Sequence, residues 1–127
     1  MKLTEPTEFA KLTKRSKYRV APADQRRYNG RTYASKAEMK RAMQLDADPT
    51  VRLVIPQPIQ MLVPGFKYTP DFGILWADGQ FWFEDVKGFE DRHFKRVKAM
   101  WREHGKATLF IIDSKSLRVR ERIPGRI

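Results

Sequence analysis

The segment from Tyr68 to Gly88 constrains the fold most, because it holds two apolar, aromatic-rich runs around an Asp-Gly pair. It reads YTPDFGILWADGQFWFEDVKG, a pattern that predicts a β-hairpin. Asp71 lies near the start of the first run, and Asp85 and Lys87 lie near the end of the second. The predicted hairpin therefore carries two carboxylates and one ammonium group near its open end.

The length of the hairpin turn decides whether these charged groups meet. Asp85 and Lys87 are two residues apart, so they project from the same face of the strand. A two-residue turn at 78–79 puts Asp71 on the other face, whereas a three-residue turn at 77–79, or a bulge, puts Asp71 directly opposite Asp85. Opposed carboxylates repel each other, and a divalent cation removes that repulsion. Carboxylate oxygens are natural ligands of Mg²⁺.

Upstream of the hairpin, a capping box predicts a helix from Ser35 to about Asp46. Ser35 is the predicted N-cap, and Glu38 follows three residues later. Completing this capping box would by itself account for Glu38, and any role in chemistry is an alternative to that local role. A strand is predicted at 51–55, and two prolines then demote the chain to an edge or bulged segment that resumes at 60–63.

Downstream of the hairpin, an amphipathic helix is predicted over 90–104. Its apolar face carries Phe94, Val97 and Trp101. Strands are predicted after it at 107–112 and 117–123. The element order is α-β-β-β-α-β with a final strand. Three sequential strands can form an antiparallel meander, and the second helix then carries the chain to a strand of the same sheet.

The charge of the chain is high and unevenly distributed. The net charge is +11, with a pI near 10.2. Residues 1–31 hold nine Lys/Arg against three Asp/Glu, residues 88–127 hold eleven against five, and the segment between them holds six against seven. Two basic ends around a slightly acidic centre favour a polyanionic partner, although charge that only keeps the protein soluble is the alternative. We interpret residues 1–27 as a basic arm and 28–127 as one domain.

Several classes of protein are disfavoured by what the sequence lacks. No apolar run approaches 18 residues, so no membrane span or membrane partner is expected. The N-terminus MKLTEPTEFAKLTKRSKYRV has no apolar core typical of a secretory signal. There is no cysteine, which excludes disulfides and thiolate metal sites. We therefore expect a cytoplasmic protein.

Pro70-Asp71 followed after fourteen residues by Asp85-Val86-Lys87 resembles the PD-(D/E)xK signature of the restriction-endonuclease-like nucleases. Other segments extend the resemblance over residues 17–112, to a small phage-encoded branch that is similar to archaeal-type Holliday-junction resolvases. These segments are KYR at 17–19, NGRTYASKAE at 29–38, the Gln-Pro at 57–58, YTPDF at 68–72, EDVKG at 84–88 and the FKRVKAMWRE that follows.

The resemblance implies a restriction-endonuclease-like αβββαβ core, in which helices flank a mixed central sheet. It implies a Mg²⁺-dependent, structure-selective DNA endonuclease, and we expect a Holliday-junction resolvase that acts on four-way-junction or other branched DNA. Mn²⁺ is expected to substitute for Mg²⁺. A junction presents two symmetric strands, so a homodimer is the economical assembly. A phage-encoded protein of this kind would work in the host cell cytoplasm.

Carried onto this sequence, the resemblance makes Asp71 and Asp85 metal ligands, with the Val86 carbonyl as a third. Lys87 becomes the catalytic lysine. Glu38 matches the acidic residue that such nucleases often place on the first helix, facing the metal. A shift of one residue would make Glu84 the ligand in place of Asp85, although its spacing from Lys87 favours Asp85.

Basic residues outside this cluster are the candidates for DNA backbone contacts. They are Lys14, Arg15, Lys17, Arg19, Arg26, Arg27, Arg31, Lys36, Lys95, Lys98 and Arg102. Lys95, Lys98 and Arg102 form one stripe of the second predicted helix, which is either a solvated face or a phosphate track. Two other functions remain open. One is a PD-(D/E)xK endonuclease of nicking, flap or transposase-associated type, and the other is a non-catalytic basic DNA-binding accessory protein.

Overall fold

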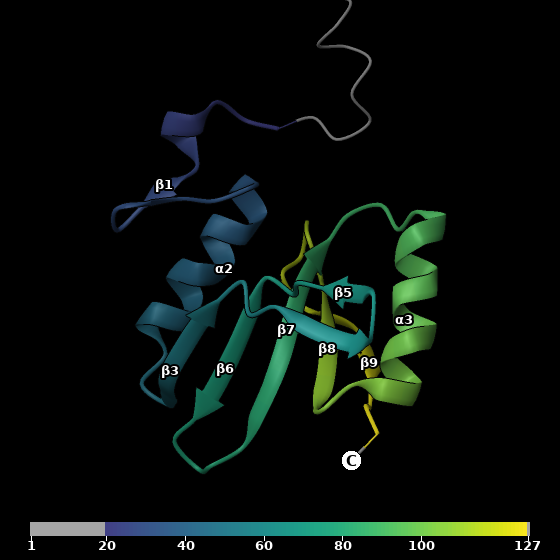
Figure 1. The fold of residues 1–127 in the computed structure, drawn as a ribbon. Coiled ribbons are helices and arrows are strands. Elements are labelled where there is room, and N and C mark those ends of the chain that lie inside the picture. The colour runs from purple at the N-terminus through teal and green to yellow at the C-terminus, as the bar shows by residue number, and fades with distance from the viewer. Residues whose placement is uncertain (1–19, 127) are drawn as a thin grey trace, which may run out of the picture.

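A five-stranded mixed sheet in the order β3-β6-β7-β8-β9 forms the centre of the fold (Figure 1). The structure, a computed structural model, describes residues 20–126. The strands of this sheet are β3 (Val51–Pro56), β6 (Phe72–Trp76), β7 (Phe81–Lys87), β8 (Thr108–Asp113) and β9 (Val119–Ile123). Neighbouring strands are antiparallel except β7 and β8, which are parallel and are connected through α3 (Arg92–His104). The predicted meander and helical crossover are confirmed.

The β6–β7 hairpin has the three-residue turn that brings the carboxylates together. The Trp76 N–H donates to the Gln80 carbonyl at 2.9 Å, and Gly79 has a φ of 90°, which an L side chain rarely adopts. Phe72 pairs with Glu84, so the same register puts Asp71, one residue before β6, opposite Asp85. Of the two turn lengths that the sequence allows, the structure has the one that places both acids on one face.

Two α-helices in the described part of the chain cover opposite faces of the sheet (Figure 1). The helix α2 (Lys36–Ala47) begins at the predicted N-cap, where Ser35 Oγ accepts from the Glu38 N–H at 3.1 Å. It packs against one face of the sheet through Ala42 and Leu45. The other face is covered by α3, whose buried residues are the predicted Phe94, Val97 and Trp101.

Two short hairpins were not predicted as such. The strands β4 (Gln60–Val63) and β5 (Phe66–Tyr68) form a separate two-stranded sheet, so the prediction that 60–63 resumes the preceding strand is wrong. The two prolines of this region end β3, and the chain then turns back on itself locally. The strands β1 (Arg27–Tyr28) and β2 (Arg31–Thr32) form the other hairpin.

The turn between β1 and β2 is formed by Asn29 and Gly30. Asn29 and Gly30 have φ values of 52° and 82°, as a two-residue turn of the primed type requires. A short 3₁₀ helix, η1 (Ala23–Gln25), precedes this hairpin. Most of the predicted basic arm, including Lys14, Arg15, Lys17 and Arg19, lies outside the described residues. Between residues 20 and 126, no helix is long and apolar enough to cross a membrane.

Candidate active site

Side chains along β7 alternate between the two faces of the sheet, and this alternation separates its two acidic residues. Phe83, Asp85 and Lys87 face α3, and the Lys87 Nζ lies 4.4 Å from the centre of the Phe94 ring. Glu84 and Val86 face α2 instead. Asp85 is therefore the acid on the same side as Lys87, and Glu84 has a different environment.

The environment of Glu84 is a buried ion pair with Arg41 of α2. Arg41 Nε donates to Glu84 Oε1 at 2.7 Å, and Arg41 Nη2 donates to Oε2 at 2.9 Å. The indole N–H of Trp82 also donates to Oε2, at 3.1 Å. The Glu84 side chain is only 2% exposed. A carboxylate whose oxygens are held this way ties α2 to the sheet, and it has little freedom to bind a cation.

Asp71 and Asp85 lie together at the end of the sheet where β6 begins and β7 ends, toward the top of Figure 1. Asp71 Oδ2 accepts from the Val86 N–H at 2.7 Å, which holds the carboxylate across the hairpin. Asp85 is 4% exposed and accepts a hydrogen bond from the hydroxyl of Tyr68 on β5. The two carboxyl groups are also close enough for the charge of Asp85 to act on Asp71. The open end of the hairpin thus holds two interacting acids.

Glu38 reaches the same cluster from the first turn of α2. Its carboxylate accepts from the Ala34 N–H and interacts with the Asp71 carboxyl group. The Ser35 side chain caps the Glu38 N–H, so one half of the predicted capping box is present. The carboxylate of Glu38, however, interacts with Asp71 and Asp85. The structure therefore brings together all three acids that the sequence singles out.

Burial and the neighbouring carboxylates raise the pKa values of Asp71 and Glu38. Burial raises the pKa of Asp71 well above its usual range, and the charges of Asp85 and Glu38 raise it further. Burial and the charge of Asp85 raise the pKa of Glu38 to about 7, although Lys87 opposes this shift. Burial beside Asp85 also raises the pKa of the Tyr68 hydroxyl, which keeps it a hydrogen-bond donor. The cluster therefore carries more ionisable acid groups than its buried surroundings stabilise in the charged form.

The backbone after β7 is fixed by Arg120 of β9. Arg120 Nη2 donates to the carbonyls of Lys87 and Gly88, at 2.6 and 3.1 Å. It also donates to Asp113 Oδ1 at 2.7 Å, while Nη1 donates to Glu90 Oε2 at 3.0 Å. These hydrogen bonds fix the backbone of Lys87, whose ammonium group lies on the same face as Asp85.

The donor set suits a hard divalent cation. Asp71 and Asp85 offer the carboxylate oxygen atoms that Mg²⁺ prefers, and bound positive charge would offset the carboxylate repulsion. Within residues 20–126, no group of three or more His, Cys, Asp or Glu side chains is arranged to hold a metal ion. The acid oxygens instead accept hydrogen bonds from the Val86 N–H and the Tyr68 hydroxyl. A cation that binds here would have to replace some of these hydrogen bonds with bonds between the acid oxygens and itself.

The predicted DNA contacts divide into engaged and exposed side chains. Lys98 Nζ lies 2.7 Å from both Glu90 and Glu121, and Arg102 pairs with Glu121 at 3.2 Å. Arg26 donates to the carbonyls of Ala21 and Tyr33. The remaining predicted side chains within residues 20–126 are exposed, and they are Arg27, Arg31, Lys36 and Lys95.

Sequence reasoning missed three residues that shape the site. They are Tyr68, which bonds Asp85, Arg41, which neutralises Glu84, and Arg120, which holds the Lys87 carbonyl. Tyr68 belongs to the YTPDF segment that carries part of the family resemblance, so the sequence did offer a signal for its role. The other two act from elements distant in sequence, and no local pattern marks them.

Comparisons of this chain with protein-family models, with curated proteins and with solved structures give no match. What the fold and the site define is a mixed α/β protein with a buried acidic cluster at one end of its sheet, beside a lysine.

The raised pKa of Glu38 predicts a pH dependence of stability. Because the folded-state pKa is raised, the folded protein holds this proton more tightly, and stability is lost as pH rises from about 4.5 to about 7. Glu38→Gln should remove this loss. We expect the metal-free variant to gain about 2 kcal/mol relative to the native protein between pH 4.5 and pH 8, allowing for partial exposure. Urea unfolding in EDTA measures it.

The matched control is Glu103→Gln, an exposed glutamate on α3. Its unfolding free energy should follow that of the native protein at both pH values. Parallel pH profiles for Glu38→Gln and the native chain would show that Glu38 titrates like a surface glutamate.

Proposed function

We propose that this protein is a Mg²⁺-dependent, structure-selective DNA endonuclease of the PD-(D/E)xK superfamily, and that its substrate is a four-way junction. The proposed core is the restriction-endonuclease-like one, with α2, the three antiparallel strands, α3 and β8 as its αβββαβ elements. The order of these elements and the parallel β7–β8 pair are compatible with that core.

One observation carries the proposal. Glu38, Asp71 and Asp85 come from a helix and two strands and meet in a buried cluster, with Lys87 on the same strand as Asp85. Ionised Glu38 and Asp71 cost stability there, because their pKa values are raised, so stability does not explain the cluster. Acids kept together against their repulsion are a mark of functional sites.

In the proposed mechanism, Asp71 and Asp85 hold the cation through their carboxylates and Val86 through its carbonyl. The chemistry supplied by a bound Mg²⁺ would be Lewis-acid activation of the phosphodiester and of a water. Tyr68 orients Asp85 through its hydrogen bond, and the Val86 N–H orients Asp71. Both acids are then positioned before substrate arrives, which reduces the reorganisation needed for reaction.

Lys87 is the residue that would act on the reacting atoms. Its ammonium group can orient the attacking water or stabilise charge that develops on the phosphate. Glu38, with a pKa of about 7, can hold or release a proton near neutral pH. Arg120 fixes the Lys87 backbone and is a positioning residue.

A twofold dimer would bring two such sites to the two symmetric strands of a junction. β3 forms one edge of the five-stranded sheet, and its Leu53 and Ile55 side chains are 51% and 40% exposed. An exposed apolar edge strand supports association with a second copy.

A cleavage assay with Mg²⁺ and with EDTA tests the proposal on four-way junction, flap and plain duplex DNA. We expect junction cleavage with Mg²⁺ and none with EDTA. Mg²⁺ should also raise the melting temperature at pH 8, and Asp71→Asn should abolish this shift. Preferred cleavage of flaps or nicked duplexes would indicate the other endonuclease type. DNA binding with neither cleavage nor a Mg²⁺ effect would indicate an accessory protein.

A further inference from the structure

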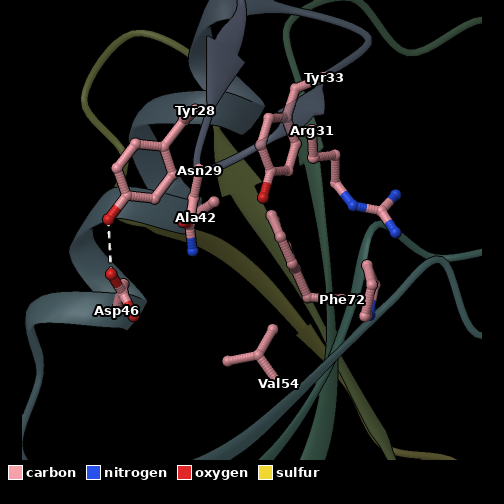
Figure 2. Close-up of a pocket in the computed structure, with 9 residues that line it drawn as sticks. Tyr28, Asn29, Arg31, Tyr33, Ala42, Asp46, Val54 and Phe72 are labelled. Carbon is pink, nitrogen blue, oxygen red and sulfur yellow. Dashed lines mark hydrogen bonds between the residues drawn. The ribbon is translucent and has the colours of Figure 1, made fainter.

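A cavity of about 220 Å³ lies between the β1–β2 hairpin, α2 and β3 (Figure 2). None of Glu38, Asp71, Asp85 and Lys87 lines it. Its aromatic lining is provided by Tyr28, Tyr33 and Phe72, and Val54 lies at one side. The mechanism above makes no use of this cavity.

Polar groups lie around the aromatic lining of the cavity. Tyr28 Oη donates to Asp46 Oδ2 at 2.5 Å, as Figure 2 shows. Asn29 and Arg31 are also among the lining residues. A ligand that fits must be small and flat, with an apolar surface and hydrogen-bonding groups at its edge. The volume is below the ~300 Å³ of sites for larger organic ligands.

The cavity and the acidic cluster share two segments of chain. Phe72 lines the cavity, and Asp71, the residue before it, belongs to the cluster. Tyr33 lines the cavity, and the N–H of the next residue, Ala34, bonds the Glu38 carboxylate. Phe72 and Asp71 point to opposite faces of the sheet, so the closer link runs along α2, where Glu38 of the cluster and Ala42 of the cavity lining are four residues apart on one face of the helix. A DNA strand with a phosphate at the cluster would therefore pass near the cavity.

We propose that this cavity binds one unstacked nucleobase of the DNA strand whose phosphate lies at the acidic cluster. The proposal rests on the function proposed above. Aromatic rings stack on any base and carry much of the affinity in single-strand recognition. The exposed Arg27 and Lys36 side chains are close to this site in the chain and can contact the flanking phosphates. Asp46 accepts hydrogen bonds, so a base with an exocyclic amino group fits better than thymine.

A double-mutant cycle between the protein and the DNA tests the proposed base site. The affinity of the full-length protein for four-way junctions is measured in EDTA, where the strands stay intact. Each junction carries one abasic residue, placed in turn at each position near the branch. In the native protein, one position should lose about tenfold in affinity when its base is removed. In the Tyr28→Leu variant, removal of the same base should cause almost no further loss of junction affinity.

Two further variants complete the design. Phe81→Leu replaces a 37%-exposed aromatic residue at the other end of β7, and it should leave the tenfold effect intact. Asp46→Asn should retain the effect of the abasic position and reduce the preference for amino-bearing bases over thymine there. Asp46 is exposed, so this variant provides a test even where loss of the Tyr28 ring unfolds the hairpin.

The outcomes separate this proposal from the nuclease itself. Junction binding in which no abasic position couples to Tyr28 overturns the base site and leaves the nuclease untouched. Coupling in a chain that fails to cut with Mg²⁺ supports the base site and removes the nuclease. A chain that binds no junction even at low salt overturns both.

Discussion

Asp71→Asn is expected to lower the rate of junction cleavage by about a thousandfold or more while making the metal-free protein more stable. The rate falls because a neutral amide replaces a charged ligand in the proposed cation site. Stability rises because the native carboxylate is buried against Asp85 and Glu38 and its pKa is raised. A raised folded-state pKa means that stability is lost as pH rises above the usual aspartate range, so the amide should add about 1–2 kcal/mol at pH 8.

The amide of this variant can still accept the Val86 N–H, so the hairpin should remain intact. Single-turnover cleavage with Mg²⁺ gives the rate, thermal melting in EDTA gives the stability, and junction affinity in EDTA should change little. Asp24→Asn, at an exposed position in η1, is the matched control and should be neutral in all three. If Asp71→Asn lowers stability along with the rate, Asp71 is a structural residue.

Arg41→Met is expected to destabilise the protein by about 3–5 kcal/mol, the usual cost of leaving one partner of a buried ion pair uncompensated. Glu84 is 2% exposed and receives both donors of the Arg41 fork, so water cannot replace the lost guanidinium. Urea unfolding at pH 7 measures the loss. The double variant Arg41→Met/Glu84→Gln should recover at least half of it, because the buried charge is then gone.

Arg52→Met, at an exposed position of β3, is the control and should lie within about 0.5 kcal/mol of the native protein. The repaired double variant should also cleave DNA at a rate near that of the native protein, because Glu84 and Asp85 face opposite sides of the sheet. A loss below about 1 kcal/mol for Arg41→Met would show that the pair is not the clamp between α2 and the sheet.

The parts of the fold that follow from local rules were predicted from the sequence. The N-cap at Ser35 and the buried stripe Phe94, Val97 and Trp101 depend on near neighbours in the chain, and both are confirmed. The position of Asp71 depended on one unknown, the length of the turn. Gly79 favours the three-residue form by adopting a positive φ, but the sequence also allowed the shorter turn.

The missed features depend on contacts between distant segments. Residues 60–63 have the composition of a strand, and nothing local shows that they pair with 66–68 and not with the central sheet. Lys98 looked like a free surface charge, yet Glu121 lies 23 residues further along the chain and binds it. Arg120 reaches the Lys87 carbonyl from a strand at the far end of the sequence. Pairings of this kind are set by tertiary packing, which local patterns do not encode.

Because side chains alternate between the two faces along β7, the adjacent codons for Glu84 and Asp85 are expected to evolve under different constraints. Within residues 20–126, the hydrogen-bond partners of the Glu84 carboxylate are Arg41 and Trp82, so a lineage can replace the ion pair by two apolar side chains in compensating steps. Asp85, one codon later, faces the acidic cluster and has no such freedom. Homologues with the proposed activity should therefore vary jointly at positions 41 and 84 while retaining the acids and the lysine. A search profile that weights 71, 85 and 87 and leaves 84 free would detect divergent members that a fixed EDVKG block would miss.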